Sequence, residues 1–243
     1  MEKTSHAVAK VPELTLAFWI IKIAATTLGE TGGDAASMSM NLGYLISTLI
    51  FAVIFFVAVV GQIKSDRFNP LLYWVTIIAT RFADRSLGIG YAGGSTLLMC
   101  LLLVSLFVWY RVMGSVSVTT VSSPKAEMFY WVTIMFSQTL GTALGDWTAD
   151  TVGLGYSGAA MIFGGLLLVI VIAYYATEIP RTLLFWAAFI LTRPLGAVVG
   201  DFLDKPVANG GLAMSRYGAS IALVVFIIVC GAVFRQRPAK VAH

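Results

Sequence analysis

Four stretches along the chain share one pattern of apolar and polar positions. Each begins with an aromatic residue and a tryptophan, continues as an apolar run interrupted by Thr, Ser, Gln, Gly and charged residues, and ends near a glycine. The four stretches are Phe18–Asp34, Tyr73–Ile89, Tyr130–Asp146 and Phe185–Asp201. Three of them contain the motif Leu-Gly-x3-Gly-Asp, whereas the second carries Asp84 in place of the first glycine and Ile89 in place of the aspartate. Such regular recurrence indicates a repeat architecture.

A plainer apolar run follows each of these stretches. The four runs are Leu42–Ile63, Thr96–Tyr110, Tyr156–Tyr175 and Tyr217–Phe234. Because a helix needs about 20 residues to cross the hydrocarbon of a bilayer, each run predicts a transmembrane helix. We therefore predict an all-α polytopic membrane protein with eight transmembrane helices in four tandem, parallel helix-pair repeats.

A larger duplication encloses the four repeats. An offset of 112 residues carries Trp19 onto Trp131 and Trp74 onto Trp186. The same offset relates Pro12 to Pro124, and no gap is needed between these positions. We predict a first half over residues 1–112, a polar connector over 113–127 and a second half over 128–243.

Composition supports the membrane assignment. Hydrophobic residues make up 58% of the chain and charged residues 12%, about half the charged share of a soluble domain. The first thirteen residues are polar and lack the apolar core of a cleavable signal peptide. The two cysteines, Cys100 and Cys230, lie inside apolar runs without metal-ligand spacing, which predicts a packing role. The lysines and arginines lie mainly at predicted loop ends rather than on a soluble patch, so we expect no nucleic-acid partner.

The basic residues also predict an orientation. Ten of the sixteen fall at the termini or in the loops that lead from one pair to the next. They are Lys3, Lys10, Lys64, Arg67, Arg111, Lys125, Arg181, Arg235, Arg237 and Lys240. Only Arg85, Lys205 and Arg216 fall on the other side. Because cytoplasmic loops carry the excess of Lys and Arg, we predict a bacterial inner-membrane location with both termini in the cytoplasm.

Polar side chains in the first helix of each pair predict an inner position for that helix, because such groups face a bundle interior rather than lipid. Seven of these residues lie about halfway along their helices and form one predicted polar layer. The candidate substrate-binding residues are Thr26, Thr80, Arg81, Ser137, Gln138, Thr192 and Arg193. Arg193 has no acid in its own turn, so it needs a partner from another helix or from a ligand.

An acidic layer is predicted beyond the polar one. Its members are Glu30, Asp34, Asp84, Asp146 and Asp201, with Asp150 and Asp204 just beyond. Carboxylates at the C-terminal end of a helix are locally unfavourable unless a cation compensates them. Hard divalent cations prefer oxygen ligands of this kind, so these residues are candidate metal ligands for a cation that would be a substrate, with no resident cofactor expected.

Each feature also has a structural interpretation. Asp34, Asp146 and Asp201 are candidate N-caps of the segment that follows, and the paired glycines have the spacing that lets helices approach closely. The tryptophans are candidate interface anchors. Lys22 lies close enough to the cytoplasmic end to extend its charge into water. Arg81 and Asp84 have the spacing of an ion pair within one helix.

No catalytic constellation is visible, and we expect the protein not to be an enzyme. The two histidines, His6 and His243, lie in the tails, and none of the familiar hydrolase, metalloprotease or nucleotide-binding motifs occurs. Aspartates at equivalent repeat positions fit a pore or a binding ring better than an acid and a base in distinct environments.

The Trp-led Leu-Gly-x3-Gly-Asp repeats resemble those of a family of bacterial inner-membrane proteins built of repeated helix pairs. The motifs are Leu28-Gly29 with Gly33-Asp34, Leu140-Gly141 with Gly145-Asp146, and Leu195-Gly196 with Gly200-Asp201. The resemblance covers nearly the whole chain and implies efflux of a divalent metal, manganese in particular. The departures in the second copy favour a pseudo-twofold site over a strictly fourfold one.

These observations predict a transporter of a small ion, with a divalent cation favoured, whose partners are the lipid bilayer and that ion. One alternative is an anion or organic-acid carrier that holds its substrate with Arg81 and Arg193. Another is a membrane scaffold or regulator whose repeats only pack. The substrate, the direction of transport, the coupling ion and the oligomeric state, including a homodimer, stay open at this stage.

Overall fold

The computed structural model describes residues 9–80 and 90–239, and in these ranges the regular secondary structure is helical, apart from one isolated β-bridge between Pro12 and Pro238. The described residues form eight α-helices. They are α1 (Leu16–Asp34), α2 (Gly43–Lys64), α3 (Pro70–Ile78), α4 (Gly90–Met113), α5 (Pro124–Asp146), α6 (Gly155–Ala176), α7 (Arg181–Asp204) and α8 (Arg216–Val233). Of these, α2, α6 and α8 agree with the sequence prediction to within one residue at each end, and α4 extends the predicted run in both directions.

Local sequence explains several helix starts. Asn69 accepts a hydrogen bond from the backbone N–H of Leu72 at the start of α3, and Ser123 accepts one from Ala126 at the start of α5. In both helices a proline follows at the first position, where its missing N–H costs nothing. The side chain of Thr15 caps α1 in the same way.

Five helices in the described part are long and apolar enough to cross a membrane: α2, most of α4 from Gly93 onward, α6, α7 and α8. The protein is therefore a helical membrane protein. Helix α7 differs from the other four in burial: 67% of the residues in its apolar window are buried inside the protein, against 11–17% in α2, α4, α6 and α8. Most apolar side chains of these four helices therefore point outward, away from the rest of the protein.

Helices α1, α3, α5 and α7 form an inner bundle. Helix α1 packs on α7 and α3, and α5 packs on α7. The remaining side of the bundle is closed where the hydroxyl groups of Tyr73 in α3 and Tyr130 in α5 form a 2.7 Å hydrogen bond. The first helices of the repeats therefore surround one interior, which is the arrangement that their polar content predicts.

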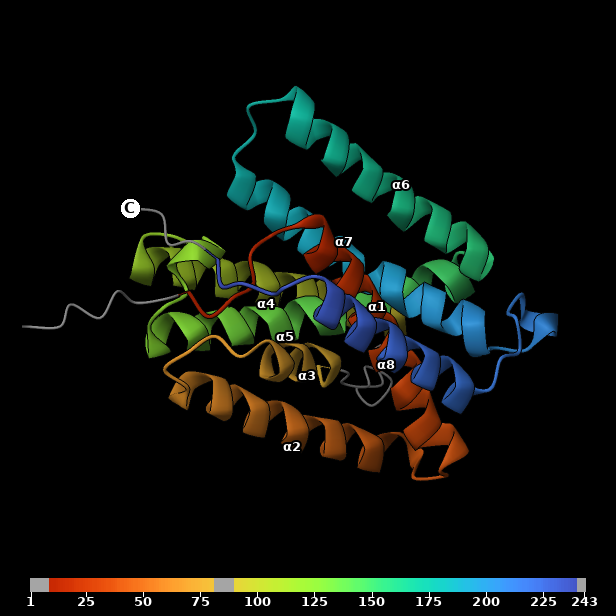
Figure 1. Ribbon diagram of the computed structural model, residues 1–243. Helices are drawn as coiled ribbons and strands as arrows, with labels where there is room; N and C mark the ends of the chain where they lie inside the picture. Colours follow the sequence, from red (N-terminus) through yellow and green to blue (C-terminus); the bar gives the residue numbers. More distant parts are fainter. Residues whose placement is uncertain (1–8, 81–89, 240–243) are drawn as a thin grey trace, which may run out of the picture.

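The outer helices pack on the inner helix of the next repeat. Helix α2 packs on α3, α4 on α5, α6 on α7, and α8 returns to pack on α1. Figure 1 shows α2 and α6 on opposite outer sides of the bundle. The predicted helix pairs are thus units of the sequence repeat, and the main packing in space is between an outer helix and the inner helix of the next repeat. Contact between successive repeats joins them into a closed ring.

The backbone repeats the duplication seen in the sequence. A π-helical turn follows α1 over Ala35–Ser39 (η1), and another follows α5 over Trp147–Thr151 (η4), which is the equivalent position at an offset of 112. Asn41 and Gly153, which correspond by the same offset, both adopt positive φ angles of 57° and 77°. The two halves thus share a turn geometry that periodicity alone does not predict.

Aromatic residues fill one end of the inner bundle. The residues that begin the four repeats are all buried: Phe18, Tyr73, Tyr130 and Phe185. Trp74, Trp131 and Trp186 pack among them, with ring centroids 5.0 to 6.4 Å from their neighbours. The interpretation of these three tryptophans as anchors at the lipid interface is therefore wrong, because their rings are buried against the aromatic residues that begin the repeats.

The connector and the first and last described residues pack together over one end of the bundle. The backbone of Lys10 donates to Val121 of the connector, and Ala239 donates to Val11. The Lys10 ammonium lies 2.7 Å from Glu127 at the start of α5. Helix α5 begins inside the predicted polar connector of residues 113–127, and a short 3₁₀ turn, Val118–Thr120 (η3), lies before it. The connector is therefore an ordered part of the fold.

Candidate functional site

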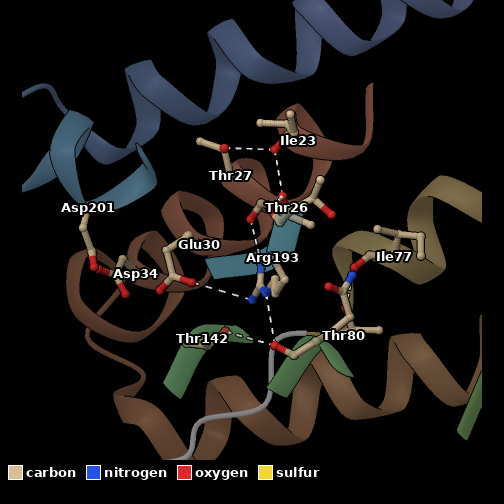
Figure 2. Close-up of polar contacts among 12 residues, drawn as sticks. Ile23, Thr26, Thr27, Glu30, Asp34, Ile77, Thr80, Thr142, Arg193 and Asp201 are labelled. Carbon is tan, nitrogen blue, oxygen red and sulfur yellow. Dashed lines mark hydrogen bonds and ion pairs between the residues drawn. The ribbon is translucent and has the colours of Figure 1, made fainter. Parts of the chain in front are cut away.

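Arg193 lies at the centre of the inner bundle. It is only 1% exposed. Its Nη1 donates to the backbone oxygen of Thr26 in α1 at 2.7 Å, and its Nε donates to that of Gln138 in α5 at 3.4 Å. Figure 2 shows the guanidinium between these helices. One side chain of α7 therefore links three inner helices.

The acid that Arg193 requires comes from another helix. Glu30 of α1, itself 4% exposed, places a carboxylate oxygen 3.6 Å from Arg193 Nη2. A buried charge without a partner is costly, so the pair explains how both groups lie in the interior. The expectation of a partner from another helix is confirmed.

The repeated glycines make room for this arrangement. A Cβ atom at Gly141 of α5 would overlap the Arg193 side chain, and one at Gly196 of α7 would overlap Thr26. A Cβ at Gly200 would lie 2.8 Å from the Cβ of Glu30. The motif glycines therefore accommodate the polar-layer and acidic-layer side chains of a neighbouring repeat. The interpretation of the paired glycines as positions of close helix packing is therefore confirmed.

Lys22 is a second buried cation in the same interior. It is fully buried, and its ammonium donates to Phe189 O at 3.0 Å and to Thr192 Oγ1 at 2.5 Å. The ammonium also lies 3.7 Å from the centre of the Phe189 ring, a cation–π contact. Lys22 therefore points into the bundle rather than toward water, because α7 supplies acceptors that α1 alone does not have.

Three carboxylates meet at the other end of α1 and α7. Oxygen atoms of Asp34, Asp201 and Asp204 lie within 4.8 Å of one another, and we call these three residues the outer acidic cluster. Lys205 Nζ lies 2.6 Å from Asp34 and 3.0 Å from Asp201. Arg216 at the start of α8 lies 3.2 Å from Asp204. The cluster thus joins α1, α7 and α8, and two basic side chains offset most of the charge of its three carboxylates.

The charge on Lys205 follows from this environment. Burial lowers the pKa of Lys205, but the Asp201 and Asp34 carboxylates outweigh burial and raise that pKa above its ordinary value. The ammonium therefore stays protonated at neutral pH. In effect, Lys205 is a tethered cation held between two carboxylates.

The structure brings together part of the predicted metal set. Asp34 and Asp201 lie in the outer acidic cluster, while Glu30 pairs with Arg193. Asp146 is not a member of the cluster, so the predicted set does not converge on one point. Asp84 lies outside the described residues.

The N-cap interpretation of the aspartates is wrong where it can be examined. Neither Asp34 nor Asp146 makes a side-chain capping bond to the π-helical turn that follows it. Asp201 lies within α7, which continues to Asp204. Asp34 instead pairs with Lys205 at the C-terminal end of α7, and Asp201 pairs with the same ammonium four residues further along the chain.

The predicted polar layer is largely assembled. Thr26, Gln138, Thr192 and Arg193 are buried and connected through Arg193 and through a 3.4 Å bond from Thr26 Oγ1 to Thr192 O. Thr80 is buried, but its hydroxyl bonds to its own helix at Ile77. Arg81 lies outside the described residues, so its pairing with Asp84 stays a prediction.

Two polar side chains of the layer have no hydrogen-bond partner in the described part. Both are fully buried: the amide of Gln138 and the hydroxyl of Ser137. A buried polar group left without a partner costs about 1–3 kcal/mol. These two groups are therefore available to bind water or a substrate in the interior.

Sequence reasoning missed the partners of the outer acidic cluster. The sequence prediction puts Asp204 just beyond the acidic layer and uses Lys205 and Arg216 only to predict the orientation of the chain. The spacing of Asp201 and Lys205, four residues apart, could have indicated an ion pair. Nothing local indicated that Arg216, twelve residues beyond Asp204, would return to it.

Comparison with protein families places the chain in a family of repeats. A family model described as "Repeat of Unknown Function (DUF347)" matches residues 17–68, 129–179 and 184–237. These segments cover more than half of the chain, so the protein belongs to this family. They contain the three copies that carry the Leu-Gly-x3-Gly-Asp motif, and the divergent second copy lies outside them. No curated protein and no solved structure matches the chain.

Proposed function

We propose that the protein is a membrane transporter of a small ion, and that this ion is a divalent cation such as manganese, exported through the interior of the inner bundle. The membrane setting is supported by the five apolar helices. In this proposal the bundle spans the bacterial inner membrane with both termini in the cytoplasm, and α3, which ends at Ile78 after nine residues, crosses it only in part. Apart from the ion, the proposal requires no partner or cofactor.

The outer acidic cluster is the observation that carries the proposal. Three carboxylates within 4.8 Å of one another offer the oxygen ligands that hard divalent cations prefer. Lys205 already places a positive charge between Asp34 and Asp201. A metal ion would take the place of this ammonium.

The proposed route continues from the cluster to the buried pair of Glu30 and Arg193. Among the described residues, Glu30 is the acid paired with Arg193 in the interior of the inner bundle. A cation that reaches Glu30 would compete with the guanidinium, which has carbonyl acceptors on Thr26 and Gln138 to retain it. In this mechanism the cation first displaces Lys205 from Asp34 and Asp201 and then displaces Arg193 from Glu30. Because the two displacements occur one after the other, the two sides of the membrane are never connected by an open path.

The test is metal flux in proteoliposomes that contain the purified protein. We expect manganese uptake into protein-containing vesicles and its loss in Asp34→Asn and Asp201→Asn variants. Asp66→Asn, an exposed acid after α2, is the matched control and should behave as the unmodified protein. Flux that is unchanged in both cluster variants would remove the proposal. Absence of flux for every ion would favour the scaffold.

The anion or organic-acid carrier is a second candidate, favoured by a specific observation. Two cations, Lys22 and Arg193, are buried in the middle of the bundle, and Glu30 is the one acid paired with them there among the described residues. The unpartnered amide of Gln138 could donate to an anion. Arg193→Glu separates the candidates, because it should abolish anion flux while leaving metal binding at the outer acidic cluster.

A further inference from the structure

A lateral groove lies between the N-terminal end of α1, the C-terminal half of α6 and the start of α7. It has a volume of about 420 Å³, within the range of about 300–1,000 Å³ that is typical of ligand pockets. It lies outside the polar interior and takes no part in the proposed transport route.

The groove has an apolar floor and an open side. Its inner wall includes Leu184, Phe185 and Ala188 of α7, all largely buried. Leu16 and Tyr175 line it as well and are 77% and 82% exposed. An apolar groove that opens sideways from a helical membrane protein faces the hydrocarbon of the bilayer, so a lipid chain has direct access to it.

A basic side chain lines the groove. Arg181 begins α7, on the side of the protein that the distribution of Lys and Arg predicts to be cytoplasmic. Its guanidinium stacks 4.3 Å from the centre of the Tyr174 ring and donates one hydrogen bond to the Tyr174 carbonyl. Those contacts hold the charge at the groove and leave further N–H donors for an anionic group.

We propose that this groove binds one anionic phospholipid, with an acyl chain against α7 and the phosphate at Arg181. The apolar lining suits an acyl chain, and Arg181 at the groove suits the phosphate of a headgroup. Basic pockets between transmembrane helices on the cytoplasmic side are known to bind lipid headgroups. The proposal goes beyond ion transport, because the groove would hold lipid whichever ion is carried.

The test is native mass spectrometry of the purified full-length protein titrated with phosphatidylglycerol or with phosphatidylcholine of the same acyl chains. We expect one tightly bound phosphatidylglycerol and weaker binding of phosphatidylcholine. Arg181→Gln should weaken phosphatidylglycerol binding about fivefold, the effect of one basic residue near an anionic surface, and remove the preference between the lipids. Arg111→Gln is the matched control, since Arg111 is also an exposed arginine stacked on an aromatic ring, Phe107.

A second variant tests the apolar part. Ala188→Phe fills the groove and should lower the binding of both lipids, whereas Ala232→Phe on the exposed face of α8 should not. Leu167→Phe, from the α6 wall, replaces the first variant if that protein does not fold, as judged by size-exclusion chromatography.

Four outcomes would overturn the proposal. They are an equal loss of phosphatidylglycerol in Arg181→Gln and Arg111→Gln, unchanged lipid binding in the filled-groove variants, and displacement of the lipid by glycerol 3-phosphate alone. The fourth is a dimer that dissociates when the groove is filled, which would make the groove an interface between two copies.

Discussion

Removing the tethered cation of the outer acidic cluster should make metal binding stronger while making the metal-free protein less stable. The perturbation is Lys205→Ala. In the folded protein Lys205 Nζ contacts two carboxylates, at 2.6 Å and 3.0 Å, and its side chain is 19% exposed. The variant leaves Asp34 and Asp201 facing each other without that charge.

The magnitude follows from how buried the contact is. Breaking a buried ion pair costs about 3–5 kcal/mol, whereas an exposed pair contributes about 0.2–1 kcal/mol. Because a fifth of the Lys205 side chain is exposed, we expect a loss of about 2 kcal/mol in metal-free protein, between these limits. Without a competing ammonium, manganese should bind about tenfold more tightly, which corresponds to about 1.4 kcal/mol.

The assay is thermal unfolding of the detergent-solubilised protein over a series of manganese concentrations, with isothermal titration calorimetry for affinity. We expect Lys205→Ala to unfold at a lower temperature without metal and to recover stability as manganese is added. Ligand at about one hundred times its dissociation constant stabilises a protein by about 2.7 kcal/mol, enough to offset the loss. Lys64→Ala, an exposed basic residue of α2, is the control and should change neither quantity.

One result would refute the reasoning directly. If Lys205→Ala is destabilised but manganese binds no more tightly than to the unmodified protein, the carboxylates form a structural ion-pair cluster and not a cation site. Recovery with sodium chloride at matched ionic strength would point to the same conclusion, because it would show general screening of like charges.

Three further predictions concern the inner bundle and use thermal unfolding as the measurement. Gly141→Ala should destabilise the protein by about 1–3 kcal/mol, the usual cost of overpacking, because the added Cβ would overlap the Arg193 side chain. The control Gly165→Ala should not destabilise the protein, because the space around Gly165 is open. Equal effects of the two substitutions would contradict the packing role of Gly141. Arg193→Met should cost about 3–5 kcal/mol by removing the cation beside the buried carboxylate of Glu30, and adding Glu30→Gln should recover most of that loss. No recovery would show that loss of this ion pair does not cause the destabilisation. Tyr73→Phe should cost about 1 kcal/mol through the lost buried hydroxyl bond, and an unchanged unfolding temperature would show that the bond adds nothing.

The amino-acid sequence determined the helices, the repeats and the division into inner and outer helices. Apolar runs and motif spacing predicted α2, α6 and α8 to within one residue at each end, and an offset of 112 relates the two π-helical turns. These features depend on local or periodic sequence patterns, so each of them can be predicted from the residues of its own repeat. The sequence also predicted that Arg193 needs a partner from another helix or from a ligand. Burying a charge within a membrane costs free energy whichever helix supplies its partner.

The tertiary structure decided which neighbours meet. Position along a helix indicated that Lys22 and the tryptophans could lie near an interface, but the packing of α7 against α1 buries Lys22 on Phe189 and Thr192. The same packing selects Asp34 and Asp201 from the predicted acids and adds Asp204. Periodicity gives the face of a helix that is buried, whereas the identity of the facing helix depends on how the ring closes. Helices α2, α4 and α6 each pack on the helix that follows directly in the chain, whereas the contacts of α1 with α7 and α8 join residues far apart in the chain. No local pattern encodes those distant contacts.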